Sequence, residues 1–452
     1  MSDIAGHRLS PADYAEAFAD LTPPLSRKTA LVEASRCLFC YDAPCVEACP
    51  TGIDIPRFIR GIQTDNVRGA ATTILDANIL GGTCARVCPT EILCEGACVR
   101  LDQDHEPVAI GALQRYATDF LFVSGEQPFV RAAATGKRIA VVGAGPAGLA
   151  CAHHLARLGH EVVIFERRPK GGGLNEYGIA TYKMTDNFAQ RELDFLLALG
   201  GIELRCGTTL GEDLHLADLV HEFDAVFLGI GLGGSNALRI EGEDLPGVEN
   251  AVAFIEALRQ APDKGELPIG RDVVVIGGGN TAIDMAIQAR RLGAENVTIA
   301  YRRGSAQMGA TGYEQELAQT NGVTIRTWVA PVRILGADGA VSGIELEHTR
   351  IGEGGVLAGT GERFVLPADQ VFKAVGQHLV PAALNGSAMR LELAGGKVVV
   401  DAERRTTLPK VWAGGDAIGL DQDLTVVAVE DGKQAARSIH HALSAGPGLG
   451  GN

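Results

Sequence analysis

The sequence has no apolar run approaching the ~18 residues that a membrane-spanning helix needs. Residues 1–28 also lack the basic segment and apolar stretch of a secretory signal, so we expect a cytoplasmic protein with no membrane partner. Basic residues are in short supply too, because 40 Lys and Arg face 55 Asp and Glu. The formal net charge of −15 repels phosphate backbones, and we expect no nucleic-acid partner.

Several catalytic signatures are missing as well. The sequence contains no P-loop, no HExxH and no GxSxG motif. No Cys-x-x-Cys occurs after residue 137, which disfavours a dithiol reductase of the thioredoxin-reductase kind. Cys151 and Cys206 lie singly in apolar segments, and we expect both in the core. The adjacent pairs His153-His154 and His440-His441 are expected on helix surfaces.

What the sequence does contain is apolar material and glycine. Hydrophobic residues make up 46% of the 452 residues, which suffices for the cores of about three domains. The 58 glycines, about 13% against a typical ~7%, indicate many tight turns or close backbone approaches. Before residue 137 the sequence shows helical patches, such as Ile55–Arg68 and Ile110–Val123, and no strand pattern.

Ten cysteines are present, and eight of them lie between Cys37 and Cys98. In a large chain without a secretory signal, such crowding indicates metal or redox chemistry. Only one Cys-x-x-Cys is present, whereas zinc sites favour two, and both halves carry Cys-Pro-Thr, which is closer to iron–sulfur ligation. Zinc and structural disulfides remain the alternatives. By analogy with bacterial ferredoxins we predict two clusters, one on Cys37, Cys40, Cys45 and Cys98 and the other on Cys49, Cys88 and Cys94.

From Arg138 onward the sequence predicts two βαβ units, about 130 residues apart. In each unit a buried strand leads into a glycine-rich turn, a helix follows, and a second strand completes the unit. A last helix is expected over about 425–442. The predicted strands are Arg138–Gly143, Glu161–Glu166, Ala225–Gly229, Asp272–Gly277, Asn296–Tyr301, Gln370–Val375 and Val411–Ala413.

The first glycine turn has the dinucleotide-binding form GxGxxG. Gly143 permits the tight turn, Gly145 lets the backbone approach a pyrophosphate, and Gly148 lets helix and strand pack closely. Glu166 ends the second strand, where a carboxylate can accept hydrogen bonds from a ribose. The succession of strand, turn, helix, strand and terminal acid is stronger evidence for a dinucleotide-binding site than the glycine pattern alone.

A second feature indicates which dinucleotide binds there. Near the C-terminus, Val411-Trp-Ala-Gly-Gly-Asp416 precedes the last helix, which begins at about Thr425. Over residues 138–445 the chain resembles flavoproteins of the two-dinucleotide disulfide-reductase type, in which this aspartate closes the FAD site on the ribityl chain. A turn-capping role for Asp416 is the alternative.

The second glycine turn, Gly277-Gly-Gly-Asn-Thr-Ala282, has the GxGxxA form that dinucleotides also accept. Its second strand ends in Tyr301-Arg302-Arg303, without an acid. An arginine at this point can accommodate the 2′-phosphate of NADPH. The alternative is a solvated charge pair, or stacking on the adenine of either nicotinamide cofactor.

Several motifs resemble those of one family, the dihydropyrimidine dehydrogenases. The whole chain is similar to the smaller, PreT-type subunit of the bacterial enzyme, and the glutamate synthase small subunit, which shares this architecture, is the nearest competitor. The motifs that carry the resemblance are Cys37-Leu-Phe-Cys-Tyr-Asp-Ala-Pro-Cys45, Cys84-Ala-Arg-Val-Cys88-Pro-Thr, Ile110-Gly-Ala-Leu-Gln114, Gly173-Leu-Asn-Glu-Tyr-Gly-Ile-Ala180, Gly278-Gly-Asn-Thr-Ala282, Tyr301-Arg-Arg-Gly304 and Glu430-Asp-Gly-Lys-Gln-Ala435.

The resemblance implies an α/β fold with an N-terminal helical domain that holds two [4Fe–4S] clusters. Two Rossmann-like dinucleotide-binding domains of the disulfide-reductase type follow, the second inserted in the first. In the family a glutamine completes the second cluster. Gln114 falls on that position, which makes Cys84 a non-ligand and favours the pyrimidine branch over glutamate synthase. The implied limits are 1–136 for the helical domain, 137–232 and 377–445 for the FAD domain, 233–376 for the NAD(P) domain and 446–452 for a disordered tail.

The resemblance also implies cofactor contacts. Lys183, an implied FAD contact, stands where the mammalian-type enzyme has arginine. Gly309 stands where NADPH-using relatives place a further arginine, and the absence of that charge favours NADH over NADPH. The implied FAD contacts are Gly143, Gly145, Gly148, Glu166, Leu174, Lys183, Asp416 and Thr425, and the implied nicotinamide-cofactor contacts are Gly277, Gly279, Asn280, Thr281, Arg302, Arg303 and Gly376.

The implied activity is that of the electron-input subunit of a dihydropyrimidine dehydrogenase, which oxidises NADH at FAD and passes electrons singly through the clusters. No side chain is expected to act as a catalytic acid or base, because the cofactors carry the hydride step. The pyrimidine should react on another chain, since an FMN-binding (β/α)₈ barrel needs ~250 residues that the three regions do not leave. We therefore expect a partner of the PreA type, containing FMN and iron–sulfur clusters, that reduces uracil or thymine within a heterotetramer. The alternatives are a glutamate synthase small subunit, a stand-alone NAD(P)H:ferredoxin-type oxidoreductase and a non-catalytic, redox-sensing scaffold.

Overall fold

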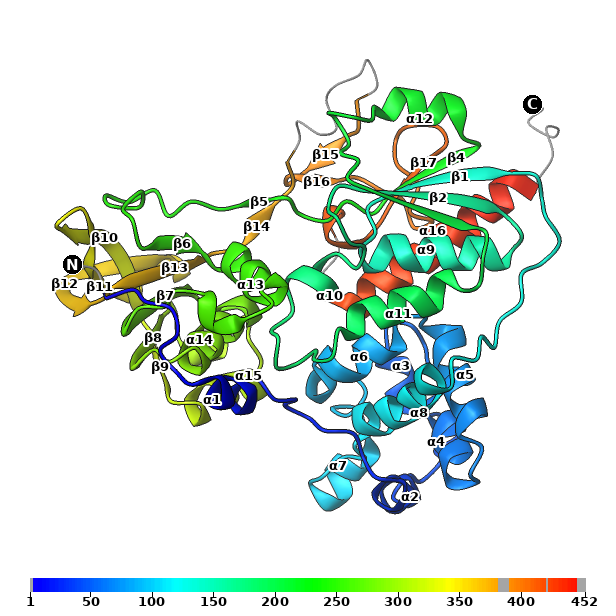
Figure 1. The fold of residues 1–452 in the computed structure, drawn as a ribbon, viewed down its shortest axis with the longest axis horizontal. Coiled ribbons are helices and arrows are strands. Elements are labelled where there is room, and N and C mark those ends of the chain that lie inside the picture. Colours follow the sequence, from blue (N-terminus) through cyan, green and yellow to red (C-terminus); the bar gives the residue numbers. More distant parts are fainter. Residues whose placement is uncertain (1–2, 381–389, 420–421, 445–452) are drawn as a thin grey trace. The chain divides into compact units, whose positions relative to one another are not determined.

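The computed structural model describes residues 3–380, 390–419 and 422–444 and forms two compact units (Figure 1). The smaller unit comprises Met1–Leu21, Tyr177–Thr185 and Ser235–His378, and the larger unit comprises Thr22–Glu176, Asp186–Gly234 and Leu379–Asn452. Two short strands, β5 (Gly234–Ser235) and β14 (Gln377–His378), lie where the chain passes between the units. The predicted domain limits stay predictions, and the predicted disordered tail lies outside the described residues.

The N-terminal part of the larger unit is helical. Its helices are short because polar capping residues start them at close intervals: Ser26 caps the first, Asp54 a second and Asn66 a third. Asp65, with φ +62°, interrupts the predicted helical patch 55–68 and divides it in two. The helices are α2 (Arg27–Ser35), α3 (Pro44–Glu47), α4 (Ile55–Gln63), α5 (Val67–Ala77), α6 (Gly81–Val87), α7 (Val99–Asp104) and α8 (Ile110–Ser124).

The rest of the larger unit is built on a five-stranded parallel sheet, in the order β17-β4-β1-β2-β3. Figure 1 shows α9, α11 and α16 on one side of this sheet and α12 on the other. The strands are β1 (Arg138–Val142), β2 (Glu161–Glu166), β3 (Ile202–Cys206), β4 (Ala225–Leu228) and β17 (Val411–Ala413), with the small hairpin β15 (Leu393–Ala394) and β16 (Lys397–Val398); the helices are α9 (Pro146–Arg157), α10 (Leu174–Tyr177), α11 (Phe188–Leu197), α12 (Leu216–Glu222) and α16 (Thr425–Ser444).

The helical part and the sheet part of the larger unit share one hydrophobic core. Leu113 and Leu121 on α8 belong to the same buried cluster as Leu149 on α9 and Leu196 on α11. Phe122 adds edge-to-face contacts with two rings of α11, with centroid distances of 5.4 and 5.0 Å. Aromatic pairs of this kind contribute about 0.5–1.5 kcal/mol beyond their buried area, so the helical part is packed firmly onto the sheet helices.

The smaller unit contains a second five-stranded parallel sheet, in the order β6-β13-β7-β8-β9. Helices α13, α14 and α15 pack on one side, and a three-stranded antiparallel sheet contacts the other. The strands are β6 (Val248–Asn250), β7 (Asp272–Gly277), β8 (Asn296–Ala300), β9 (Val323–Arg326), β13 (Gln370–Ala374), β10 (Val329–Ala337), β11 (Ala340–Ile351) and β12 (Leu357–Pro367), and the helices are α1 (Pro11–Ala17), α13 (Ala251–Gln260), α14 (Asn280–Arg291) and α15 (Gly312–Thr320).

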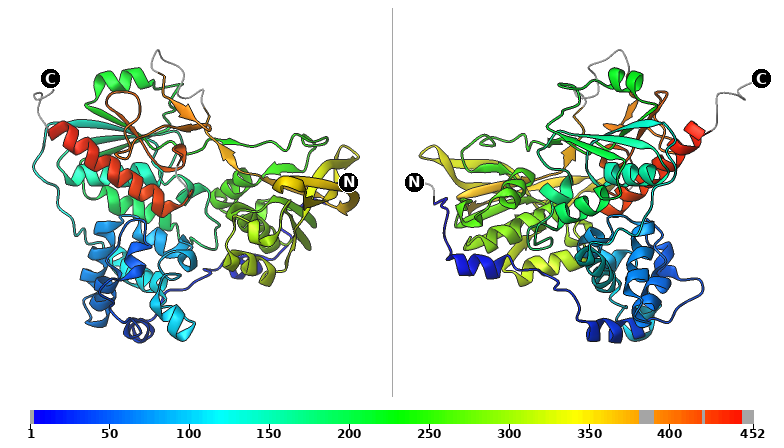
Figure 2. Two further views of the ribbon diagram at one scale, coloured as in Figure 1. Left: turned by 180° about the vertical axis from the view of Figure 1, so that it is seen from behind. Right: turned by 45° about the vertical axis from the view of Figure 1, so that its right-hand side comes forward.

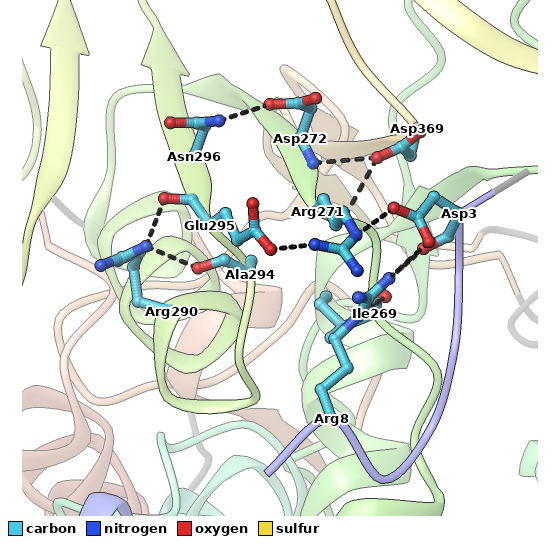
Figure 3. Close-up of polar contacts among 10 residues, drawn as sticks. All are labelled: Asp3, Arg8, Ile269, Arg271, Asp272, Arg290, Ala294, Glu295, Asn296 and Asp369. Carbon is cyan, nitrogen blue, oxygen red and sulfur yellow. Dashed lines mark hydrogen bonds and ion pairs between the residues drawn. The ribbon is translucent and has the colours of Figure 1, made fainter.

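The N-terminal segment of the chain lies along the smaller unit (Figure 3). Asp3 forms an ion pair with Arg271, which also pairs with Glu295, and the Arg8 guanidinium donates to Asp3 and to the Ile269 carbonyl, the latter at 2.8 Å. Ion pairs as exposed as these contribute only ~0–1 kcal/mol each. The attachment therefore depends more on backbone hydrogen bonds and on the packing of α1 than on these charges.

The predicted strands agree with the structure to within one residue at each end. Two predictions about single residues were wrong. Cys206 is exposed, because it is the last residue of the edge strand β3. His153 is only 3% exposed, because α9 is packed between the sheet, α16 and α11. Within the described ranges, no helix is long and apolar enough to cross a membrane.

Candidate cofactor sites

The first predicted cysteine group comes together in the larger unit. Cys37, Cys40, Cys45 and Cys98 line one small cavity, whose other walls are mostly apolar, as at Ile59, and include Arg100. The loop after α2 reaches this geometry through two residues in the left-handed region, at positions 39 and 43. Burial, together with the neighbouring thiols, raises the pKa of Cys45 to about 12. Four sulfur donors therefore surround one hollow, and a bound cation would favour the thiolate form of Cys45.

The second predicted group also gathers, in the helical part of the same unit. A hydrogen bond with Cys84 and burial raise the pKa of the Cys88 thiol, and the neighbouring Cys94 and Cys49 raise it further. The Cys94 pKa is raised mainly by burial and by Glu95. The structure thus places Cys84 beside Cys88, one of the three predicted ligands, at the end of the same helix.

Gln114, the fourth predicted ligand of this group, is buried on α8. Its Nε2 donates to the Gly81 carbonyl at 2.7 Å, and Gly81 begins α6, the helix that carries Cys84 and ends just before Cys88. Gln114 therefore lies beside the segment that bears two of these thiols. Its role as a ligand stays a prediction.

The chemistry of the two cysteine groups fits iron–sulfur ligation, which requires clustered thiolates in a protected site. Among the residues that the structure describes, no three His, Cys, Asp or Glu side chains converge closely enough to hold a single metal ion. All ten cysteines are free thiols, so the disulfide alternative has no support in the structure. The sulfur atoms of both groups would hold the clusters.

The first glycine turn lies between β1 and α9. Gly143 has φ +98°, and a Cβ on Gly148 would lie 1.9 Å from the Gly143 carbonyl oxygen, so both positions require glycine. A Cβ on Gly145 would meet nothing closer than 3.8 Å. Glu166 Oε2 accepts a hydrogen bond from the Ala144 N–H at 2.7 Å, which places its carboxylate at the turn. The open approach over Gly145 and the acid beside it fit a dinucleotide.

The segment that ends in Asp416 lies in the same unit. Gly415 has φ +71° and donates to Asp431 Oδ2 at 2.9 Å, which fixes the turn. Burial, the largest cause, and the neighbouring Asp423 raise the pKa of Asp416 to about 6, although Lys397 opposes the rise. The oxygens of this carboxyl can accept hydrogen bonds from sugar hydroxyls.

Two further predicted flavin contacts lie beside the first glycine turn. Gly173 packs so closely on Gly145 that a Cβ on Gly173 would lie 2.6 Å from the Gly145 Cα. Leu174 follows it, 40% exposed, and Thr425 Oγ1 at the start of α16 donates to Asn175 Oδ1 at 3.3 Å. The structure therefore brings the neighbourhoods of Gly145, Leu174 and Thr425 together.

Lys183, also a predicted FAD contact, belongs to the smaller unit. Its ammonium lies 2.8 Å from Asp284 Oδ1 and 2.6 Å from Glu314 Oε1. Burial lowers the pKa of this ammonium, but the two carboxylates outweigh burial and raise the pKa above its usual value. The lysine is therefore held in its charged form by α14 and α15, and a contact with FAD stays a prediction.

The second glycine turn joins β7 to α14 in the smaller unit. A Cβ on Gly279 would meet no atom within 4 Å, whereas one on Gly278 would lie 2.4 Å from the Tyr301 ring. Asn280 Oδ1 is buried without a hydrogen-bond partner in the described structure. Such an orphaned acceptor beside an open helix N-terminus fits a ligand that donates a hydrogen bond and carries phosphate.

The other predicted nicotinamide-cofactor contacts lie around this turn. The Arg302 carbonyl accepts a hydrogen bond from Thr349 Oγ1 at 2.8 Å, and the Arg303 carbonyl accepts one from the Trp328 N–H at 3.0 Å. These bonds fix the backbone of both arginines after the end of β8. Gly376 has φ +92°, a conformation that favours glycine. Gly309 lies over the turn, where a Cβ added to it would be 3.8 Å from the Gly279 Cα. Thr281 follows Asn280 on α14.

Two family models together match most of the chain. Residues 14–126 match the dihydropyrimidine dehydrogenase domain II, a 4Fe-4S cluster domain, and residues 137–446 match the pyridine nucleotide-disulphide oxidoreductases. The PreT subunit of NAD-dependent dihydropyrimidine dehydrogenase from Escherichia coli K12 is 36% identical over 427 residues, which cover 94% of this chain and 97% of that one. The glutamate synthase [NADPH] small chain of the same organism is 35% identical over 452 residues, with 94% of each covered.

The chain belongs to the PreT and glutamate synthase small-chain family. It is therefore an NAD(P)H-dependent oxidoreductase with a helical 4Fe-4S domain and an FAD-binding domain. Among solved structures, Mycobacterium tuberculosis FprA in complex with NADPH superposes with a TM-score of 0.58 at 22% identity, over 68% of this chain and 85% of that one. Thioredoxin reductase from T. acidophilum superposes with a TM-score of 0.52 at 23% identity, over 68% of this chain and 99% of that one. These likenesses confirm the predicted fold class.

Replacing Gly279 by alanine should specifically weaken the binding of the nicotinamide cofactor. The backbone at this position (φ −97°, ψ 177°) suits any residue and the Cβ has room, so the fold should persist. The methyl group would occupy the approach of the pyrophosphate. We expect at least about tenfold weaker NADH binding, a cost of ~1.4 kcal/mol, measured from the NADH dependence of flavin reduction. Unchanged NADH affinity would contradict the assignment of this turn.

The raised pKa of Asp416 predicts a pH dependence of stability. The folded state binds the proton more tightly than the unfolded chain, where the pKa is the ordinary 3.8. The protonated Asp416 carboxyl therefore contributes its full stabilisation of the folded state below about pH 4, and this contribution is lost as the pH rises to about 6. Relative to Asp416→Asn, the free energy of unfolding of the flavin-free wild type should fall by up to about 3 kcal/mol over this range. Denaturant titrations of both proteins at several pH values would test this, and parallel profiles would refute it.

Proposed function

We propose that this protein is the electron-input subunit of a dihydropyrimidine dehydrogenase. It would take reducing equivalents from NADH at FAD and send them through two [4Fe–4S] clusters to an FMN- and iron–sulfur-containing, PreA-type partner that reduces uracil or thymine reversibly. The observation that carries the proposal is the gathering of cysteines in one helical region, where four thiols line one cavity and a second group surrounds Cys88, with Gln114 bonded to the start of the helix that precedes Cys88. The likeness to PreT proteins over 94% of the chain supports the same assignment.

The residues of the chain position the cofactors and supply no acid or base to the hydride step. Gly145 would admit the FAD pyrophosphate, Glu166 would hold the adenosine ribose and Asp416 the ribityl chain. For the nicotinamide cofactor, the N-terminus of α14 would hold the pyrophosphate, with Asn280 completing a hydrogen bond. When bound, FAD converts a two-electron hydride donor into a source of single electrons for the clusters.

The cysteine groups differ in their relation to the flavin part of the chain. The second group lies close to α16, since Lys433 on α16 donates to the carbonyl of Thr51, two residues after Cys49. The first group shares its cavity with Leu38, which is 48% exposed, and the side chain of Tyr41, which follows Cys40 in the sequence, is fully exposed. We therefore propose that electrons enter through the second cluster and leave through the first.

The experiment has two stages. Anaerobically purified protein should be yellow-brown, contain iron and sulfide, and lose its flavin absorbance rapidly when NADH is added. Addition of a PreA-type partner and uracil should then give continuous NADH oxidation. Uracil reduction by the isolated chain would overturn the two-subunit proposal, and a preparation with zinc in place of iron or without flavin would overturn the electron-transfer role.

A second candidate is the small chain of glutamate synthase, favoured by the 35% identity to the Escherichia coli protein. The same electron path would then serve a different large subunit. Purification of the native protein with its partner, followed by identification of that partner, distinguishes the two. The ratio of kcat/KM for NADH and NADPH adds a second criterion, because Gly309 leaves the 2′-phosphate without the further arginine that the NADPH-using relatives are expected to have.

A further inference from the structure

Lys433 is a buried cation that joins the flavin side of the larger unit to the helical part. It lies on α16, which runs along the side of the sheet that faces the helical part (Figure 2). The side chain is 9% exposed, and Nζ donates to the Thr51 carbonyl at 3.0 Å and to the Ala77 carbonyl at 2.8 Å. Glu430, one turn earlier on α16, lies 2.6 Å from the same nitrogen.

The first of these carbonyls leads to Cys49. Thr51 follows Cys49 by two residues, and its Oγ1 lies 3.4 Å from the Cys49 Sγ in a hydrogen bond. Thr51 itself is buried, 5% exposed. The ammonium therefore fixes the turn that presents one ligand of the second cysteine group.

The second carbonyl leads to Cys84 and Cys88. Ala77 precedes Asn78, whose side-chain Nδ2 donates to the Cys84 Sγ at 3.2 Å while its Oδ1 accepts from the Leu80 N–H at 3.0 Å. Cys84 lies one helical turn before Cys88, whose backbone N–H donates to the Cys84 carbonyl at 3.0 Å. One buried charge on α16 thus contacts the segment that holds Cys49 and the segment that precedes the helix of Cys84, next to Cys88.

We propose that Lys433 is a positioning residue that raises the reduction potential of the cluster on the second cysteine group and so favours electron entry from the flavin side. This inference rests on the proposed function. The step moves one electron from the reduced flavin to the oxidised cluster, without forming or breaking a bond to Lys433. The reduced cluster carries one more negative charge, and a buried ammonium whose donors point toward the ligand-bearing segments stabilises that charge. The Glu430 carboxylate, paired with the same ammonium, opposes the effect.

The test is an anaerobic redox titration of the holoenzyme, followed by electron paramagnetic resonance, with iron and sulfide determined in parallel. Lys433→Gln keeps a hydrogen-bond donor, removes the charge and leaves Glu430 uncompensated. It should lower the second-cluster potential enough to change the electron-transfer equilibrium about tenfold, which is ~59 mV for a one-electron couple. The potential of the first cluster should stay unchanged, and Lys433→Arg should restore most of the loss.

The matched control is Arg437→Gln, which removes a positive charge from the next turn of α16, where the side chain is exposed. It should leave both potentials unchanged. Glu430→Gln tests the same inference without touching the lysine, and should raise the second-cluster potential. If Lys433→Gln fails to retain the cluster, Glu430→Gln still tests whether the charge at this position sets the second-cluster potential.

The inference is overturned if Lys433→Gln with full iron content has the wild-type potentials, or if Glu430→Gln leaves the second-cluster potential unchanged. It is also overturned if Arg437→Gln has the same effect as Lys433→Gln. Failure of the proposed function looks different, because it would already be visible in the wild type as missing iron, missing flavin or no reduction by NADH.

Discussion

Replacing Gly145 by alanine should give a folded protein that has lost most of its flavin. Gly145 is the residue before α9 and has ordinary backbone angles (φ −79°, ψ −178°), and a Cβ would lie 3.8 Å from its nearest neighbour. The protein therefore tolerates the methyl group, which would stand where the FAD pyrophosphate must approach the backbone. We expect at least about tenfold weaker FAD binding, or ~1.4 kcal/mol, measured as flavin absorbance per chain after gel filtration.

The matched control is the neighbouring glycine of the same turn. Gly148→Ala would place its methyl carbon 1.9 Å from the Gly143 carbonyl oxygen, so this change should damage the packing of α9 on β1 whether or not flavin binds. The two variants should differ in thermal unfolding of the flavin-free protein, where Gly145→Ala resembles the wild type and Gly148→Ala unfolds earlier. Full flavin content in Gly145→Ala would mean that the turn is structural only.

The sequence was sufficient for the parts of the fold that depend on local patterns. The strands that end in glycine turns are continuous apolar runs, and Glu161–Glu166, Asp272–Gly277 and Val411–Ala413 were predicted with their observed limits. Ferredoxin-like spacing also indicated which four thiols meet at the first cavity, although their role as cluster ligands stays a prediction.

The sequence was not sufficient where distant segments meet. Nothing local indicates that Tyr177–Thr185 belongs to the smaller unit, where Thr181 bonds to Gln288 on α14. Glu192 is another example: burial raises its pKa to about 7 although Thr83 donates hydrogen bonds to it. Its neighbours come from a helix more than a hundred residues away, so a charged residue on α11 would ordinarily be placed on the surface.

The cysteine network is the clearest case of a role that spacing alone leaves open. Cys84 was set aside only because the family resemblance supplied Gln114 as a ligand. In the structure Cys84 lies one helical turn before Cys88, and Gln114 donates a hydrogen bond to Gly81 at the start of the same helix. Cys84 has a second partner in Asn78, which gives this thiol a structural role without any metal. We therefore expect opposite effects on the second cluster when each of these two side chains is replaced.

Gln114→Leu should destroy the second cluster, whereas Cys84→Ser should leave both clusters intact. Leucine has a similar volume but offers neither an oxygen ligand nor the hydrogen bond to Gly81, so the cluster would lack its fourth donor. Serine can still accept the hydrogen bond from Asn78. We expect Gln114→Leu to lose about half of the iron and the second-cluster resonance, and Cys84→Ser to keep both. Gln114→Glu, which retains an oxygen donor, separates lost ligation from lost packing. Loss of the cluster in Cys84→Ser, with Gln114→Leu unaffected, would make Cys84 the ligand and remove the main distinction from the glutamate synthase branch.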